Sequence, residues 1–228
     1  MNVLGLKGVE RRDFIVAGAM AVLLAGLPLA SKAQQGAPAA AGKREAVILV
    51  VGDSLSAEYG LKRGEGWVPL LAKRIADQRI AATVVNASIS GDTTSGGRSR
   101  LPPLLAQHKP THVILELGGN DALRGLPLKS TEDNLNQMTR AAQAAGAKVL
   151  LVGMQVPPNY GGDYTRRFEQ LFESVATANK AALVPFLLKG VADVQEAPAL
   201  FQTDRIHPAA VAQPRMLDNV WPELKKLL

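Results

Sequence analysis

The sequence predicts an α/β protein with three layers, in which helices cover both faces of a parallel sheet. Short apolar runs alternate with longer segments of helical spacing from residue 46 to the C-terminus. The first run, residues 46–51 (AVILVV), is continuously hydrophobic and largely β-branched, as is typical of a strand buried on both faces. Because parallel strands require long connections, the helical segments are expected to form right-handed crossovers.

Five short apolar segments are expected to form the strands. They are residues 46–51, 83–86, 113–117, 148–152 and 182–186. Each is rich in valine, leucine or isoleucine, and polar, glycine or proline residues lie near its ends. The sequence contains no internal repeat, and the chain is long enough for one domain with a sizeable core.

The helices are expected between the strands and at the C-terminus. They are residues 67–78, 96–108, 130–145, 164–181 and 209–228. Residues 67–78 place apolar side chains at helical spacing. Pro102 and Pro103 are expected to interrupt the second helix. Ser130, followed three residues later by Asp133, has the pattern of a capping box that would begin the third helix.

Residues 1–33 have the pattern of an export signal. Arg11 and Arg12 precede an uncharged apolar segment at residues 14–30, which is shorter than the about 20 residues of a membrane span. Arg-Arg-Asp-Phe-Ile resembles the twin-arginine signal. We therefore expect cleavage after Ala33 and a periplasmic or secreted protein with no stable membrane span. An ordinary Sec signal and an uncleaved anchor are the alternatives.

Composition limits the classes of function. Residues 34–43 are rich in alanine, glycine and glutamine and are expected to form a flexible tail, with residues 44–228 as the single domain. The net charge of +6 comes from scattered basic residues and aromatic residues make up only 4%, which does not favour nucleic-acid binding. The absence of cysteine excludes disulfides, and three scattered histidines are too few for a histidine-based metal site.

Four polar motifs carry the parts of an activated nucleophile. Residues 52–56 (GDSLS) place Ser54 directly after the first strand. Residues 90–92 (SGD) and 118–121 (GGND) lie just beyond the second and third strands, and residues 204–208 (DRIHP) place a carboxylate three residues before a histidine. Because ligands bind beyond the carboxyl ends of parallel strands, these motifs are expected to meet in one crevice. Serine, histidine and aspartate form activated nucleophiles, while glycine N–H and asparagine amide groups can stabilise an oxyanion.

These motifs resemble those of the SGNH hydrolases, also called GDSL esterases, over the chain from about residue 46 to its end. Further matching blocks are residues 86–93 (NASISGDT), 116–121 (ELGGND), 123–125 (LRG) and 158–161 (PNYG). The resemblance is closest to the bacterial periplasmic branch of acyl thioesterases, arylesterases and lysophospholipases. It implies a flavodoxin-like fold with a five-stranded parallel sheet. It also implies a serine hydrolase of carboxylic esters and thioesters, among them aryl esters, acyl thioesters and lysophospholipids.

The resemblance assigns a role to each motif. Ser54 would be the nucleophile, His207 the general base, and Asp204 the carboxylate that orients the imidazole. The backbone N–H groups of Ser54 and Gly91 and the side-chain amide of Asn120 would form the oxyanion hole. This chemistry needs neither a metal nor an organic cofactor. The expected partner is a small-molecule acyl ester or thioester, and we expect a monomer.

Three positions depart from the family pattern. Arg205, Glu58 and Ala122 stand where the family commonly has glycine. If residue 205 requires a positive φ, an arginine there is expected to add backbone strain and could shift His207. Every residue with a chemical role in the family is nevertheless present.

Several residues have an ordinary structural interpretation. Ser54 alone would also suit a helix N-cap. His108 ends a predicted helix and His112 enters a predicted strand, so both are expected to be structural. Asp53 and Asp121 are expected to hydrogen-bond loop backbone rather than to exchange protons.

Apolar loop residues are expected either to line an acyl groove beside the site or to pack beneath the loops. They are Leu123, Leu126, Val156 and Pro157. Two other functions remain open, a carbohydrate acetylesterase and a non-catalytic lipid-binding carrier. A sugar site would carry stacking aromatics, for which the candidates are Trp67, Tyr160 and Tyr164. A flavin or nucleotide module is disfavoured, because neither Gly-x-Gly-x-x-G nor a P-loop follows the first strand.

Overall fold

Five strands make up the sheet of the computed structural model, which describes residues 45–156 and 158–228. They are β1 (Ala46–Gly52), β2 (Ala82–Asn86), β3 (His112–Glu116), β4 (Lys148–Val152) and β5 (Ala182–Val184). Their spatial order is β2-β1-β3-β4-β5, and every neighbouring pair is parallel. The predicted five-stranded parallel α/β fold is therefore confirmed. The expected export signal and tail, residues 1–33 and 34–43, lie outside the described residues.

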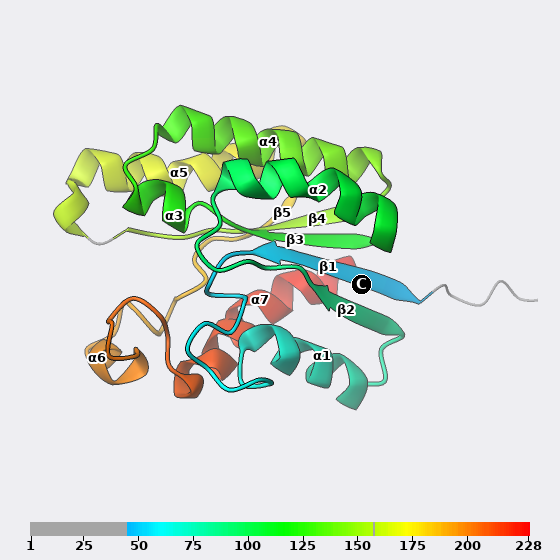
Figure 1. Cartoon of the computed structure of the whole chain (residues 1–228), viewed down its shortest axis with the longest axis horizontal. Coiled ribbons are helices and arrows are strands. Elements are labelled where there is room, and N and C mark those ends of the chain that lie inside the picture. The colour runs from blue at the N-terminus through cyan, green and yellow to red at the C-terminus, as the bar shows by residue number, and fades with distance from the viewer. Residues whose placement is uncertain (1–44, 157) are drawn as a thin grey trace, which may run out of the picture. The chain divides into compact units, whose positions relative to one another are not determined.

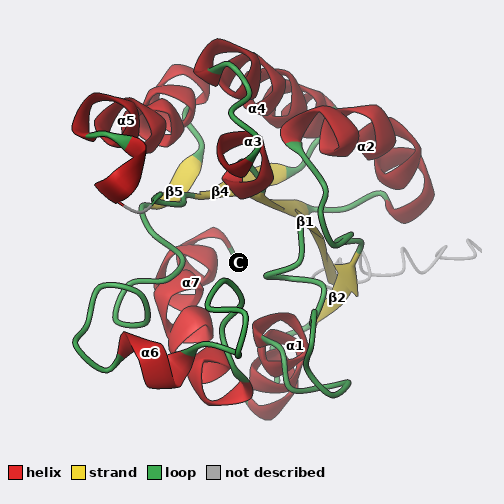
Figure 2. Ribbon diagram, turned by 60° about the vertical axis from the view of Figure 1, so that its left-hand side comes forward, coloured by secondary structure: helices red, strands yellow, loops and turns green. Residues whose placement is uncertain are grey.

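Helices cover both faces of the sheet (Figure 1). On one face α1 (Trp67–Asp77) packs against α7 (Gln213–Leu227). The opposite layer contains α2 (Thr94–His108), α4 (Leu128–Ala144) and α5 (Gly162–Asn179), as Figure 2 also shows. Shorter elements in the connections are α3 (Gly119–Leu123), α6 (Ala197–Leu200), η1 (Pro158–Tyr160) and η2 (Ala210–Ala212). Within the described ranges, no helix has the length and apolar character needed to cross a membrane.

The central strands are buried because helices cover both of their faces. The side chains of Ile48, Leu49, Val50 and Val51 in β1 are 0% exposed, and Ile114 in β3 is equally buried. Full burial of such a side chain contributes about 1.5–3 kcal/mol to stability. The two strands therefore give a rigid base to the loops that follow their carboxyl ends.

Two expectations about helices were wrong. The third expected helix begins at Leu128, and its N-cap, Pro127, makes no side-chain cap. Ser130 thus lies inside the first turn, where its backbone N–H donates to the Pro127 carbonyl (2.9 Å). The helix α2 also runs unbroken through Pro102 and Pro103. Both prolines are exposed, so water can solvate the carbonyl groups that lose their helical N–H partner.

Candidate active site

Ser54, the second residue after β1, hydrogen-bonds a histidine from the far end of the chain. Its Oγ lies 2.9 Å from Nε2 of His207, across 153 residues of sequence. The other ring nitrogen, Nδ1, lies 2.7 Å from Oδ2 of Asp204. Because a carboxylate can only accept, Nδ1 carries the hydrogen and Nε2 is free to accept the serine proton. The three side chains therefore form one directional series of hydrogen bonds.

The Asp204 carboxylate is stabilised in its charged form. Its Oδ1 accepts the backbone N–H groups of Ile206 (2.9 Å) and His207 (3.0 Å). These bonds, led by that from His207, lower the pKa of Asp204 to about 2, and the imidazole bond adds to the effect. The carboxylate thus stays ionised throughout the range in which histidine side chains titrate.

A tight turn holds Asp204 and His207 at this spacing. Phe201 and Pro208 form an antiparallel bridge at its base, and the Gln202 N–H donates to the His207 carbonyl (2.8 Å). Arg205 lies within the turn with φ of 57°, so the condition under which an arginine there adds strain is met. Such a conformation costs a non-glycine residue of order 1–3 kcal/mol. His207 still reaches Ser54, so the arginine does not displace the imidazole.

Of the other two residues that replace a family glycine, Glu58 has a positive φ and Ala122 does not. Glu58 has φ of 60°, and its Oε1 accepts the N–H groups of Gly64 and Gly66, both at 2.8 Å. These bonds organise the loop that follows Ser54. Ala122 instead lies in the short helix α3 and is not among the described non-glycine residues with positive φ. The substitution of alanine there adds no strain of this kind.

The turn at residues 201–208, which carries His207, is anchored to the loop after β1. Gln202 Nε2 donates to the Tyr59 carbonyl (2.8 Å), and the Tyr59 ring lies over the imidazole of His207 with centroids 4.3 Å apart. The side-chain amide of the buried Gln213 accepts the Trp67 N–H (3.0 Å) and donates to the Pro208 carbonyl (3.3 Å). These residues were not foreseen, because in the sequence they are an ordinary loop tyrosine and two ordinary glutamines.

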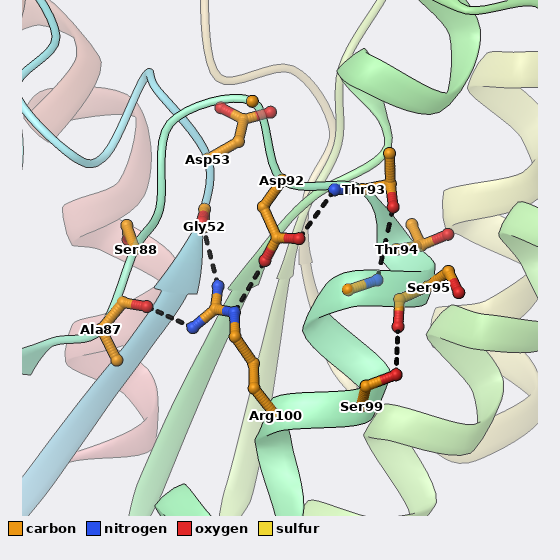
Figure 3. Close-up of polar contacts among 12 residues, drawn as sticks. Gly52, Asp53, Ala87, Ser88, Asp92, Thr93, Thr94, Ser95, Ser99 and Arg100 are labelled. Carbon is orange, nitrogen blue, oxygen red and sulfur yellow. Dashed lines mark hydrogen bonds and ion pairs between the residues drawn. The ribbon is translucent and has the colours of Figure 1, made fainter.

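Arg100 in α2 holds the ends of β1 and β2 together (Figure 3). Its guanidinium donates to Asp92 Oδ2 (2.7 Å), to the Gly52 carbonyl (3.2 Å) and to the Ala87 carbonyl. Asp92 Oδ1 in turn accepts the N–H of the next residue, Thr93 (2.9 Å). The arginine thereby fixes the loop from 87 to 92 against the strand that ends at Gly52.

Gly91 lies in this loop with φ of +78°, a conformation that favours glycine. The Ile89 N–H donates to the Gly52 carbonyl (3.0 Å), which keeps the loop close to the segment that carries Ser54. The Gly91 carbonyl accepts from Arg124 Nη2 (2.7 Å), so its oxygen is held on the side of the loop that faces α3.

Asn120 lies in α3, directly beyond β3. Its Nδ2 donates to Asp53 Oδ2 (2.9 Å), which ties α3 to the residue before Ser54. The next residue, Asp121, is 2% exposed and accepts from both the N–H (2.8 Å) and the hydroxyl of Thr94. Asp121 therefore bonds the first residue of α2 rather than the loop backbone that was expected, and it joins the start of α2 to α3.

Two carboxyl groups are buried beneath the serine. Asp53 is 3% exposed, and its Oδ1 accepts the Leu55 N–H (3.0 Å), as expected. Burial raises the pKa of Asp53 to about 6, although the bonds from Leu55 and Asn120 oppose the rise. Glu116, 0% exposed at the end of β3, accepts the Ser56 hydroxyl (2.7 Å) on Oε2. Burial, followed by the nearby Asp53 charge, raises the pKa of Glu116 well above its ordinary value.

The apolar residues expected to line an acyl groove lie in different surroundings. Leu123 is 50% exposed, Leu126 is half-buried, and Val156 packs within the hydrophobic core at 7% exposure. Pro157 lies outside the described residues. Leu123 and Leu126 thus remain predictions, whereas the burial of Val156 matches the alternative of packing beneath the loops.

The other two histidines lie away from the serine. His112 begins β3, at the opposite end of that strand from Asn120, and its Nε2 lies 3.0 Å from the Leu227 carbonyl. Burial lowers its pKa. His108 is the last residue of α2. Across residues 45–156 and 158–228, no three histidine or acidic side chains are grouped as a metal ion would require.

The bonds of Arg100 lead to a stability prediction. Its side chain is 19% exposed and that of Asp92 is 11% exposed. The substitution Arg100→Met would leave a largely buried carboxylate without its partner, so we expect the free energy of unfolding to fall by about 3 kcal/mol in urea denaturation. The control is Arg98→Met on the exposed face of the same helix, where the arginine bonds only Gln137 (3.4 Å). Equal unfolding midpoints for both variants would contradict the role of Arg100.

Comparison with known proteins gives the chain a family. Residues 50–213 match the GDSL-like lipase/acylhydrolase family. The esterase TesA of Pseudomonas aeruginosa is 56% identical over 181 residues, which are 79% of this chain and 89% of that protein. Thioesterase 1/protease 1/lysophospholipase L1 of Escherichia coli is 40% identical over 181 residues, 79% of this chain and 84% of that protein. A crystal structure of TesA has a TM-score of 0.77 at 55% identity and covers 80% of this chain and 99% of its own.

The resemblance inferred from the four motifs is therefore confirmed. The matched region begins within β1 and ends at the first residue of α7, so it includes each motif of the site. The chain belongs to the GDSL-like lipase/acylhydrolase family, and it is an ester hydrolase.

Proposed function

We propose that the chain hydrolyses carboxylic esters and thioesters through an acyl-enzyme formed on Ser54. The observation that carries this proposal is the pair of hydrogen bonds at 2.9 Å and 2.7 Å that join Ser54, His207 and Asp204. A serine hydroxyl is a weak nucleophile unless a base within hydrogen-bond reach accepts its proton. His207 is such a base, and Asp204 is the third group that orients it.

In the first step, Ser54 Oγ attacks the substrate carbonyl carbon and its proton passes to His207 Nε2. The carbonyl oxygen becomes an oxyanion, and the N–H groups of Ser54 and Gly91 and the amide of Asn120 stabilise it. Collapse of this intermediate expels the alcohol or thiol, which takes the proton from His207. Water then attacks the acyl-enzyme by the same route and releases the carboxylic acid. Neither step requires a metal or an organic cofactor.

Asp204 supports both steps without exchanging a proton. It fixes the tautomer in which Nε2 accepts, and it stabilises the imidazolium that forms during each proton transfer. The pKa of Asp204 is about 2, so the carboxylate keeps its charge at any pH at which the enzyme would work. A loss of activity in mild acid would therefore come from another group.

The exposed hydrophobic side chains, which we call the apolar rim, favour acyl or aryl substrates. Among the described residues, all of the large hydrophobic side chains that are exposed lie in connections beyond the carboxyl ends of the strands. They are Tyr59, Ile89, Leu123, Tyr160, Val194, Ile206 and Val211. We propose aryl esters, acyl thioesters and lysophospholipids as substrates, because a long acyl chain can lie across such a rim and because two relatives are named for these activities. Strict preference for acetate over longer nitrophenyl esters would favour the carbohydrate acetylesterase instead.

Covalent labelling tests the proposal directly. A fluorophosphonate should react with Ser54, because Oγ displaces fluoride while His207 takes the hydroxyl proton. We expect Ser54→Ala to abolish both labelling and hydrolysis of nitrophenyl esters. The matched control is Ser130→Ala, at an exposed serine in α4, which should label like the wild type. Folded wild-type protein that does not label would exclude the mechanism and would favour a lipid carrier.

We also propose that residues 1–33 direct export and are then removed, which would give a periplasmic or secreted, monomeric enzyme. The paired Arg11 and Arg12, the apolar segment that follows and the small residues before Gln34 support this proposal. Mass spectrometry of the protein from a periplasmic fraction should show an N-terminus at Gln34. An intact Met1 on protein that stays in the cytoplasm would contradict it.

A further inference from the structure

We propose that Asp53 is a positioning residue, which holds the Asn120 amide with its NH₂ group, rather than its carbonyl oxygen, toward the oxyanion. The inference rests on the proposed function, since it concerns the donors that stabilise the tetrahedral intermediate. Asp53 does not touch the substrate in this scheme and acts only through Asn120.

Each oxygen of the Asp53 carboxylate accepts from a different donor. Oδ1 accepts the Leu55 N–H at 3.0 Å, and Oδ2 accepts from Asn120 Nδ2 at 2.9 Å. Because an ionised carboxylate cannot donate, the amide must turn its nitrogen toward Asp53. The same nitrogen carries a second N–H in the amide plane, about 120° away from the first, and this one remains available for the oxyanion.

An asparagine at residue 53 could not accept hydrogen bonds from both Leu55 and Asn120, as the Asp53 carboxylate does. Both partners of the carboxylate are donors, so an asparagine there would satisfy one of them with its oxygen and oppose the other with its NH₂ group. If its oxygen stayed with Leu55, its NH₂ group would favour the flipped amide of Asn120. The carbonyl oxygen of Asn120 would then face the developing negative charge and destabilise the intermediate.

The charges around Asp53 set the pH at which this arrangement is lost. Burial raises its pKa to about 6; nearby His207 opposes the rise and Asp92 adds to it. Arg100 pairs with Asp92, and burial raises the pKa of the neighbouring Glu116 well above its ordinary value. As pH falls through about 6, Asp53 gains a proton and its hold on the amide weakens. Protonation of Asp53 should therefore contribute to the loss of activity in acid.

We therefore expect Asp53→Asn to lower kcat by about 10²–10³-fold with little change in KM, which is the effect of losing one oxyanion donor. The variant should remain folded with a similar Tm, because removal of a buried carboxylate offsets the lost hydrogen bond. The acid limb of kcat/KM should be steeper in the wild type than in Asp53→Asn, because only the wild type loses the Asp53 charge as pH falls through about 6. Asp193→Asn is the matched control, because this exposed carboxylate accepts only the Gly190 N–H and an amide oxygen can replace it.

A double-mutant cycle decides whether Asp53 acts through Asn120. In an Asn120→Ala background, Asp53→Asn should change kcat by less than about threefold. Full additivity, or wild-type kcat in Asp53→Asn, would overturn the inference, while fluorophosphonate labelling of Ser54 would leave the proposed function standing. If Asp53→Asn does not fold, the acid limb of Asn120→Ala decides: a limb shallower than that of the wild type supports the inference, and a limb as steep as that of the wild type overturns it.

Discussion

The position of β1 between β2 and β3 is the constraint on which the site depends. Val50 in β1 pairs with Asn86 in β2, and Gly52 pairs with Glu116 in β3, so the three strands end at nearly the same level. Ser54 follows the end of β1, the loop that carries Gly91 follows β2, and helix α3 with Asn120 follows β3. In doubly wound sheets, ligands bind where the strand order reverses, and in the order β2-β1-β3-β4-β5 that point lies between β1 and β3. The fold thus brings together the residues of the proposed catalytic site from segments that are remote in sequence.

The histidine reaches this edge by a different route. It lies in the long connection after β5, a strand at the far side of the sheet, so strand pairing alone does not bring it to Ser54. Its position depends on the side-chain amides of Gln202 and Gln213, which bond the backbone of Tyr59 in the loop after β1 and of Trp67 at the start of α1. These two contacts join the turn that carries His207 to the segment that follows Ser54, which limits the movement of the two residues relative to each other. Such preorganisation is the main source of catalysis in this class of chemistry.

Buried polar groups give the site rigidity at a cost in stability. Asp53, Asp92, Glu116 and Asp121 all lie within or just beyond the sheet edge, where each carboxyl group has hydrogen-bond donors. An isolated buried charge would be strongly destabilising, so Arg100 and the hydroxyl groups of Ser56 and Thr94 are as necessary as the carboxylates. Burial raises the pKa of both Asp53 and Glu116, so it still disfavours the charged form of each carboxyl group.

Much of this arrangement could be predicted from local sequence. The continuous apolar run of β1 and the positions of the four polar motifs after the strands have a local cause, and these predictions agree with the structure. The predicted capping box at Ser130 was wrong because α4 begins two residues earlier, at Leu128. The predicted break at Pro102 was wrong because the prolines of α2 are exposed, where water can solvate the carbonyl groups without a helical partner. The contacts of Arg100 with Gly52 and of Asn120 with Asp53 span 48 and 67 residues, and no local pattern marks them.

A crystal structure of the protein with Ser54 phosphonylated tests the central claim most directly. The bound phosphonyl group imitates the tetrahedral intermediate, and its negative oxygen marks the position of the oxyanion. The account predicts this oxygen about 2.7–3.1 Å from the backbone nitrogens of Ser54 and Gly91 and from Nδ2 of Asn120. Nδ2 should keep its bond to Asp53. An oxygen that points to solvent, or an Asn120 amide turned away from it, would contradict the account.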